Sequence, residues 1–158
     1  MSINIHLLTA SKRLAPLSRV IRTNIKSNLK FIKQFLPLRD IDIVVVDSPG
    51  NTIPHLGIAG YGPNGHTLYL YLDPTHNKFA QALQKPLLRT MAHELHHLLR
   101  WRTIGYGNSL LDALVSEGLA DHFEQEVTKG APEKWDRALS QREISRLLKL
   151  AKEEFDRT

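Results

Sequence analysis

Residues 93–97 of this 158-residue chain read HELHH, a spacing of histidine and glutamate that suits metal chemistry. On a helix, His93 and His97 project from the same face, one turn apart. Their imidazoles can therefore reach a single zinc ion at about 2.0–2.1 Å. Glu94 would lie beside the open side of that ion, where it can accept a proton from water. The pattern H-E-x-x-H therefore predicts a zinc site on a helix.

A zinc site with one open position needs a third protein ligand. The segment SEGLAD begins nineteen residues after His97 and offers Glu117 as that ligand. Asp121 lies four residues further on, so on a helix it shares a face with Glu117 and can accept a hydrogen bond from the outer N–H of a ligand histidine. Gly118 costs about 1 kcal/mol inside a helix relative to alanine. This cost predicts that the SEGLAD helix packs closely against the HELHH helix at Gly118.

Over residues 66–123 the sequence resembles the gluzincins, the thermolysin-like zinc metallopeptidases, which combine HExxH with ExxxD. The resemblance implies that His93, His97 and Glu117 bind one Zn²⁺ per chain. It also implies that Glu94 is the general base and that Asp121 supports a ligand histidine. On this reading, zinc polarises the scissile carbonyl of a peptide or protein substrate, and water attacks directly without an acyl-enzyme.

Gluzincins also place an antiparallel edge strand before the zinc helix, and the substrate backbone lies along it. The alternating segment HTLYLYL (66–72) precedes the HELHH helix and is expected to be this strand. Added main-chain pairing would then be the mode of substrate binding. The resemblance thus predicts three substrate-binding residues: Thr67, Tyr69 and Tyr71.

The chain departs from the larger gluzincins in its C-terminal part. Those proteins carry a further helical domain that supplies a histidine for the oxyanion, whereas only about 28 residues follow Gly130 here. The chain resembles a minimal, single-domain member. Tyr106, in the loop between the two site helices, is the candidate oxyanion donor. The alternative is a tyrosine that merely packs over the helices.

Hydrophobic periodicity predicts the elements that position these residues. Strands are expected over 3–8, 41–46, 54–60 and 66–72. Helices are expected over 16–36, up to about Gln84, and over 86–101 and 109–128, with a last one beginning at Ser140. This order predicts an α+β fold. We expect one zincin-like domain over 1–158, with a small mixed or antiparallel sheet and a packed helical half that carries the HExxH helix.

Composition limits the classes of protein that the chain can represent. The absence of cysteine excludes disulfides, thiolate zinc sites and a cysteine nucleophile. The first residues do not resemble a signal peptide, and no apolar run is long enough to span a membrane, so a cytoplasmic protein is expected. The net charge of +5 is concentrated in residues 1–40, which carry eight Lys/Arg and one acidic residue. The oligomeric state is left open.

Several polar residues have simpler explanations than catalysis. His96 should point away from the zinc face, and His122 and His66 are expected on the surface. The basic helix over 16–36 suits nucleic acid or an anionic membrane surface, but it has no interleaved aromatic residues, so a solvated face is the better interpretation. The sequence therefore predicts a zinc metallopeptidase. The alternative is a non-catalytic zinc protein that binds a partner or regulates, and turnover dependent on Glu94 would separate the two.

Overall fold

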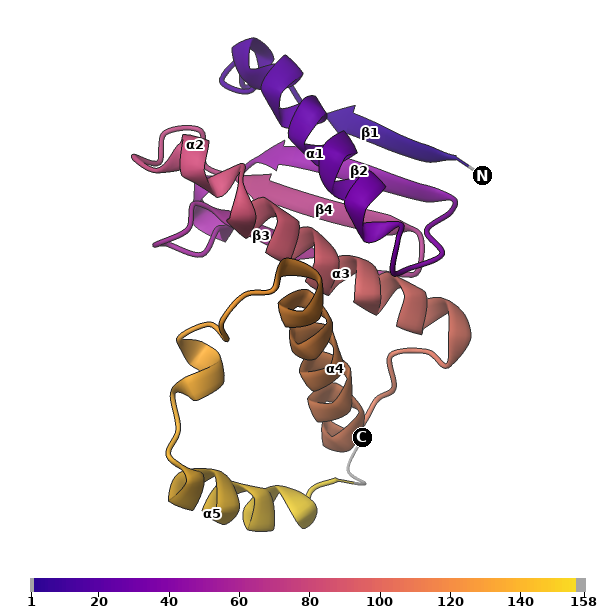
Figure 1. The fold of residues 1–158 in the computed structure, drawn as a ribbon, viewed down its shortest axis with the longest axis vertical. Coiled ribbons are helices and arrows are strands. Elements are labelled where there is room, and N and C mark those ends of the chain that lie inside the picture. The colour runs from indigo at the N-terminus through magenta and orange to yellow at the C-terminus, as the bar shows by residue number, and fades with distance from the viewer. Residues whose placement is uncertain (1, 156–158) are drawn as a thin grey trace.

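The computed structural model describes residues 2–155 and builds them around a mixed four-stranded sheet (Figure 1). The strands are β1 (Ile3–Leu7), β2 (Ile41–Asp47), β3 (Ile58–Tyr61) and β4 (Thr67–Leu72). Their order across the sheet is β1-β2-β4-β3. β1 and β4 pair in parallel with β2, and β3 pairs antiparallel with β4. The predicted α+β class and mixed sheet are confirmed.

The helices lie close to their predicted positions. They are α1 (Ser18–Ile32), α2 (Phe79–Ala82), α3 (Lys85–Thr103), α4 (Leu110–Thr128) and α5 (Gln141–Lys152), with short 3₁₀ turns at Ala15–Leu17, Pro49–Asn51 and Trp135–Arg137. The first helix is shorter than the predicted 16–36 because Pro37 disfavours a helical residue before it, and residues 33–36 form turns instead. The predicted strand 54–60 begins only at Ile58.

The core lies between one face of the sheet and the helices α1 and α3, which cover that face (Figure 1). β4 contributes Leu68, Leu70 and Leu72 to it, while the alternate residues Thr67, Tyr69 and Tyr71 are only partly buried. This alternation follows from the period of two along a strand. α3 adds buried side chains from the face opposite His93: Leu87, Met91, Leu95 and Leu98.

Two contacts fix α3 along the sheet. β3 approaches α3 so closely that a Cβ at Gly60 would collide with Glu94, and a Cβ at Gly62, just after the strand, would collide with Leu98. At the other end, Arg102 donates to the backbone carbonyl oxygens of Gly65, Arg39 and Asp40, the last at 2.7 Å. α3 is therefore held against the edge strand β3 at Glu94 and, near its C-terminal end, against the segments that precede β2 and β4.

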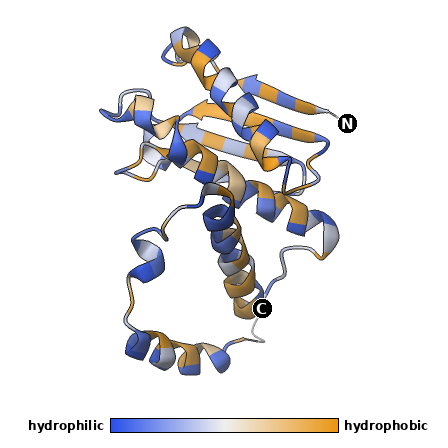
Figure 2. Ribbon diagram, viewed as in Figure 1, coloured by the Kyte–Doolittle hydropathy of each residue, from blue (hydrophilic) through white to orange (hydrophobic). Residues whose placement is uncertain are grey.

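α4 packs against α3 and begins with a capping box, in which Ser109 and Asp112 each bond the backbone of the other. The explanation predicted for Gly118 is wrong, because a Cβ there would meet nothing within 4 Å. Hydrophobic residues gather in the N-terminal half of α4 (Figure 2). α5 lies apart from the sheet, and its residues 141–150 are exposed. None of the described helices has the length and apolar character needed to cross a bilayer.

Candidate metal centre

α3 brings the two histidines of HELHH together on one face. Nε2 of His93 lies 3.0 Å from Nε2 of His97. His97 is buried and His93 is partly buried. The apolar residues on the other faces of α3 anchor the helix in the core. The helical spacing of four residues thus aims two nitrogen ligands at one point, as the sequence predicted.

α4 brings a carboxylate to the same point. Oε2 of Glu117 lies 3.3 Å from Nε2 of His93 and 3.4 Å from Nε2 of His97. The three ligand atoms lie within 4.8 Å of one another, the only such group among the residues described. Two histidines and a carboxylate are a ligand set that zinc favours. The structure therefore assembles the predicted set from two helices.

The outer nitrogens of both histidines are also bonded. Nδ1 of His93 lies 3.1 Å from Oδ1 of Asp121, and Nδ1 of His97 lies 3.1 Å from the hydroxyl oxygen of Ser116. Because an ionised carboxylate only accepts hydrogen bonds, Asp121 favours a proton on Nδ1 of His93, so Nε2 is the nitrogen that this histidine could offer to a metal. Ser116 is fully buried and was not predicted, since nothing in its local sequence shows that it faces His97.

The electrostatics of the centre favour an anionic ligand beside the histidines. Hydrogen bonds from His93 and His97 hold the pKa of Glu117 well below its usual range. Burial acts to lower the pKa of His93, but the hydrogen bond to Glu117 and the nearby carboxylates outweigh it and raise this pKa. Glu117 is thus ionised at neutral pH, the form in which a carboxylate binds a metal. The negative charge around His93 suits a bound cation.

Glu94 lies beside the centre and lines the same cavity as His93 and Glu117. Burial raises its pKa, which the two histidines oppose, and the backbone N–H of Gly62 donates to its carboxylate. A carboxylate with a raised pKa is a better proton acceptor than one in water. The close approach of β3 therefore fixes the position of this side chain as well as its basicity.

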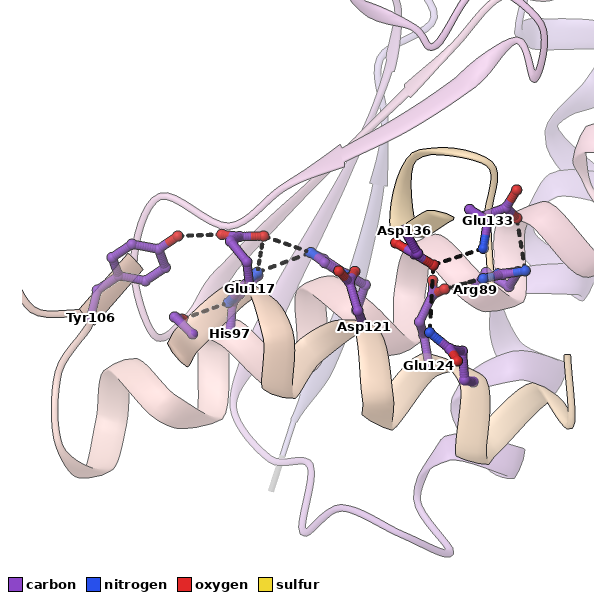
Figure 3. A network of polar contacts seen from close by, with 11 residues as sticks. Arg89, His97, Tyr106, Glu117, Asp121, Glu124, Glu133 and Asp136 are labelled. Atoms are coloured by element: carbon purple, nitrogen blue, oxygen red, sulfur yellow. Dashed lines mark hydrogen bonds and ion pairs between the residues drawn. The ribbon is translucent and has the colours of Figure 1, made fainter. Parts of the chain in front are cut away.

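Tyr106 lies in the loop between α3 and α4, and its hydroxyl donates to Oε1 of Glu117 (Figure 3). Burial and the hydrogen bond to Glu117 raise its pKa to about 12, so it keeps its proton at neutral pH. Its ring also lies against His97 and Trp101. The phenol is near the centre, as predicted, but its observed partner is Glu117, a candidate metal ligand.

The prediction that residues 66–72 form the edge strand is wrong. β4 lies between β2 and β3, so its backbone is paired on both sides and cannot accept a further strand. Thr67, Tyr69 and Tyr71 lie on the face of the sheet opposite the core, and the rings of Tyr69 and Tyr71 stack with centroids 6.2 Å apart. Strand order depends on long-range pairing, which alternation alone does not reveal.

The edge strand beside the centre is β3. The N–H of Asp73 donates to Gly57 O, and bonded pairs alternate along an antiparallel ladder. The backbone groups of Ile58 and Gly60 therefore point away from β4. Ile58 O accepts from the N–H of Ile53, which agrees with this pattern. Gly60 faces the cavity that contains His93 and Glu94, which has a volume of about 410 Å³.

The remaining histidines lie outside the ligand group. The ring of His96 packs against Phe123, with centroids 5.5 Å apart, as expected for a residue that faces away from the metal position. His122 is exposed on α4. Nδ1 of His66 lies 3.1 Å from the carbonyl oxygen of Asp40, on the loop that Arg102 binds.

A second polar cluster joins α3 and α4 and was not predicted. Arg89 is buried and donates to Oε1 of Glu124 on α4. Its Nη1 also lies 2.8 Å from Oε1 of Glu133 and 3.0 Å from the carbonyl oxygen of Ala131 (Figure 3). The only sign of this cluster in the local sequence is that Arg89 precedes His93 by one helical turn and so lies on the same face of α3. Its partners lie 35 or more residues away in the sequence.

A family described as "Predicted Zn-dependent protease (DUF2268)" matches residues 20–158. The chain belongs to this family. The match covers all of α3 and α4 and therefore every residue of the centre. Neither curated proteins nor solved structures gave a match. The family description agrees with zinc dependence and with the ligand group that His93, His97 and Glu117 form.

Proposed function

We propose that the chain is a zinc metallopeptidase of the gluzincin type, which hydrolyses peptide bonds with Glu94 as general base. The observation that carries this proposal is the convergence of His93, His97 and Glu117 at one point of a cavity that Glu94 also lines. The family description supports a zinc-dependent protease. The assignment to the gluzincins rests on the HExxH and ExxxD spacing and on the contact of Asp121 with His93.

The ligand group fits zinc in both donor type and arrangement. His93 and His97 would hold the ion through Nε2, and Glu117 through Oε2. Bound there, zinc would supply Lewis acidity, which lowers the pKa of water and polarises a carbonyl group. Asp121 and Ser116 orient the two imidazoles, and such partners typically change metal affinity or activity by about 10–100-fold.

Glu94 would handle the protons of the reaction. Its carboxylate accepts a proton from the attacking water and later delivers it to the leaving amine. Its partly buried position raises its pKa and so improves it as a base. The N–H of Gly62 donates to the carboxylate and restrains it beside the cavity.

The substrate backbone would lie along β3 and not along β4. The outward N–H and C=O of Gly60 border the cavity, and an extended peptide can pair with such an edge as an added strand. Gly60 and Gly62 allow this edge to come close to Glu94 and Leu98. The scissile bond would therefore be presented between the edge strand and the histidines.

Tyr106 has one proton to donate, and in this structure it donates that proton to Glu117. While this bond exists, the same proton cannot bind an oxyanion. A role in orienting Glu117 fits this contact directly. A role as oxyanion donor, the sequence-based prediction, requires the hydroxyl to change partner during the reaction.

The test is a comparison of zinc-loaded wild type with Glu94→Gln on a diverse mixture of unfolded peptides. New peptide termini are identified by mass spectrometry, and zinc content is measured in both proteins. We expect cleavage by the wild type and a fall of about 10²–10⁴-fold in Glu94→Gln, because it keeps zinc but lacks the base. Zinc-loaded wild type that produces no fragments would favour the non-catalytic zinc protein instead.

A further inference from the structure

Trp135 forms part of the wall of the cavity that contains the centre. It lines this cavity together with Ile53, His93 and Glu94. Its side chain is 47% exposed, so indole surface is available to a ligand in the cavity. Ligand sites are typically lined by aromatic and apolar side chains with a few polar groups. A half-exposed tryptophan beside a candidate catalytic base therefore suggests a contact with substrate.

The segment that carries Trp135 is anchored on both sides of the ring. Before it, Ala131 O and the Glu133 carboxylate both bind Nη1 of Arg89, which is itself buried against Glu124. After it, the Asp136 carboxylate accepts from the N–H of Glu133 at 2.7 Å. The ring of His55 meets that of Trp135 at 60°, with centroids 6.0 Å apart. These contacts hold the indole before a ligand binds, which reduces the entropy cost of binding.

The charge of the cavity wall limits which side chains it can accept. Apart from His93, the ionisable residues that line it are all acidic: Glu94, Glu117, Asp121 and Glu124. None of the lining residues within the described chain is a lysine or arginine. Ile53 and Trp135 provide apolar surface beside β3. An acidic side chain would be repelled, whereas a large apolar side chain would bury indole surface.

We propose that Trp135 determines specificity: with Ile53 it forms the subsite for a large apolar side chain of an extended peptide. Arg89 is a positioning residue that holds this subsite in place through Ala131 and Glu133. This inference rests on the proposed peptidase function and names its substrate class. It predicts that cleavage sites share a phenylalanine, leucine or similar residue at one fixed position.

The first test compares Trp135→Ala and Trp135→Phe with wild type on matched peptides that carry phenylalanine, alanine or glutamate at that position. We expect Trp135→Ala to lose about tenfold or more in kcat/KM for the phenylalanine peptide and little for the alanine peptide. Trp135→Phe should recover most of the loss. Leu139→Ala is the matched control, because Leu139 lies in the same segment, is 46% exposed and does not line the cavity. Unchanged selectivity in Trp135→Ala, or wild-type selection of charged residues, would overturn the proposal.

A binding test separates this subsite from the proposed reaction. The zinc-loaded double variant Glu94→Gln/Trp101→Phe leaves Trp135 as the sole tryptophan of the chain. Adding the matched peptide with phenylalanine should shift the fluorescence of this variant. The shift should occur at concentrations about tenfold lower than the peptide with glutamate requires. A shift without any cleavage by the wild type would reject the peptidase but retain the subsite. Cleavage without a shift would reject the subsite but retain the peptidase.

The role of Arg89 is tested through Glu133→Gln, which weakens one anchor and leaves the Arg89–Glu124 pair intact. We expect a severalfold rise in KM for the phenylalanine peptide, an unchanged kcat, and a red shift in Trp135 emission as the ring meets more water. Circular dichroism would verify that the variant is folded. Emission and KM equal to those of wild type would remove Arg89 from this positioning role.

Discussion

Two polar clusters join α3 to α4 about one helical turn apart, and they differ in charge and in burial (Figure 3). The metal cluster consists of His93, His97 and Glu117 with their partners Asp121 and Ser116. The arginine cluster consists of Arg89, Glu124 and Glu133. The arginine cluster contains its own cation, whereas the metal cluster directs two nitrogens and a carboxylate at one point without a lysine or arginine among its members.

The arginine cluster is also more deeply buried than the metal cluster. The side chains of Arg89 and Glu124 are each 9% exposed, and Arg89 uses its donors on protein acceptors. In the metal cluster, Glu117 is 49% exposed and borders the cavity. A closed buried ion pair fixes how two helices sit together, because breaking it leaves an unpaired charge. An open cluster with converging ligands is suited to an external cation and a substrate.

Glu117→Ala should give the largest effect, because it removes the carboxylate that converges with Nε2 of both histidines. Losing a residue that hydrogen-bonds a ligand typically lowers metal affinity by about 10–100-fold, and we expect a larger fall in zinc affinity here. Competition with a chromophoric chelator would measure this affinity. In zinc-free protein the same variant should unfold at nearly the wild-type urea concentration, since Glu117 is half exposed. Full metal content at stoichiometric zinc would remove Glu117 from the ligand set.

Arg89→Met should show the opposite pattern: a large loss of stability that does not depend on zinc. Glu124 would remain buried without a cation, which typically costs about 3–5 kcal/mol in the free energy of unfolding. Urea unfolding in the presence of EDTA would measure it. The double variant Arg89→Met/Glu124→Leu should recover most of the loss, because it also removes the buried charge. Equal stabilities of wild type and Arg89→Met would contradict the closed-cluster interpretation.

Asp121→Ala should affect zinc without affecting the arginine cluster. The loss of its contact with Nδ1 of His93 should lower metal affinity or activity by about 10–100-fold. Ser116→Ala, which removes the neutral partner of His97, is the comparison and should have a smaller effect, because hydrogen bonds to charged groups are stronger. A variant of Asp121 with wild-type affinity and turnover would place it outside the centre's function.

Tyr106→Phe should have the smallest effect and should distinguish two roles for this phenol. If the hydroxyl orients Glu117, zinc affinity should fall by about tenfold, as for other outer partners. If it binds the oxyanion, kcat should fall while zinc affinity stays unchanged. Metal titration and steady-state kinetics on the same preparation would separate these outcomes. Wild-type values in both would leave Tyr106 with packing alone.

Local features of the sequence predicted much of the fold and of the centre. The period of α3 and the starts of α4 after Ser109 and of α5 after Ser140 each depend on residues within a few positions, and the predicted helices agree with all three. The pairing of His93 with His97 depends on one helical turn. Their convergence with Glu117 was expected from the resemblance to gluzincins, and the packing of α4 on α3 provides it.

Features that depend on distant parts of the chain were missed or wrong. β4 has the alternation of an edge strand, but its position inside the sheet depends on pairing with β2, more than twenty residues earlier. Gly118 was explained by close packing, whereas the glycines that allow close approach to α3 are Gly60 on β3 and Gly62 just after it. A single sequence does not reveal which glycine faces a neighbouring element.

The sequence by itself determined the ligand types, their helical spacing and the helices that carry them, because these depend on backbone periodicity and on caps. Only the tertiary structure decided that β3 borders the centre, that Ser116 faces His97, and that Arg89 links α4 to the segment of Trp135. Those contacts join residues 19 or more positions apart, or depend on the order of strands in the sheet. The packing of the whole core selects them, so no local pattern encodes them.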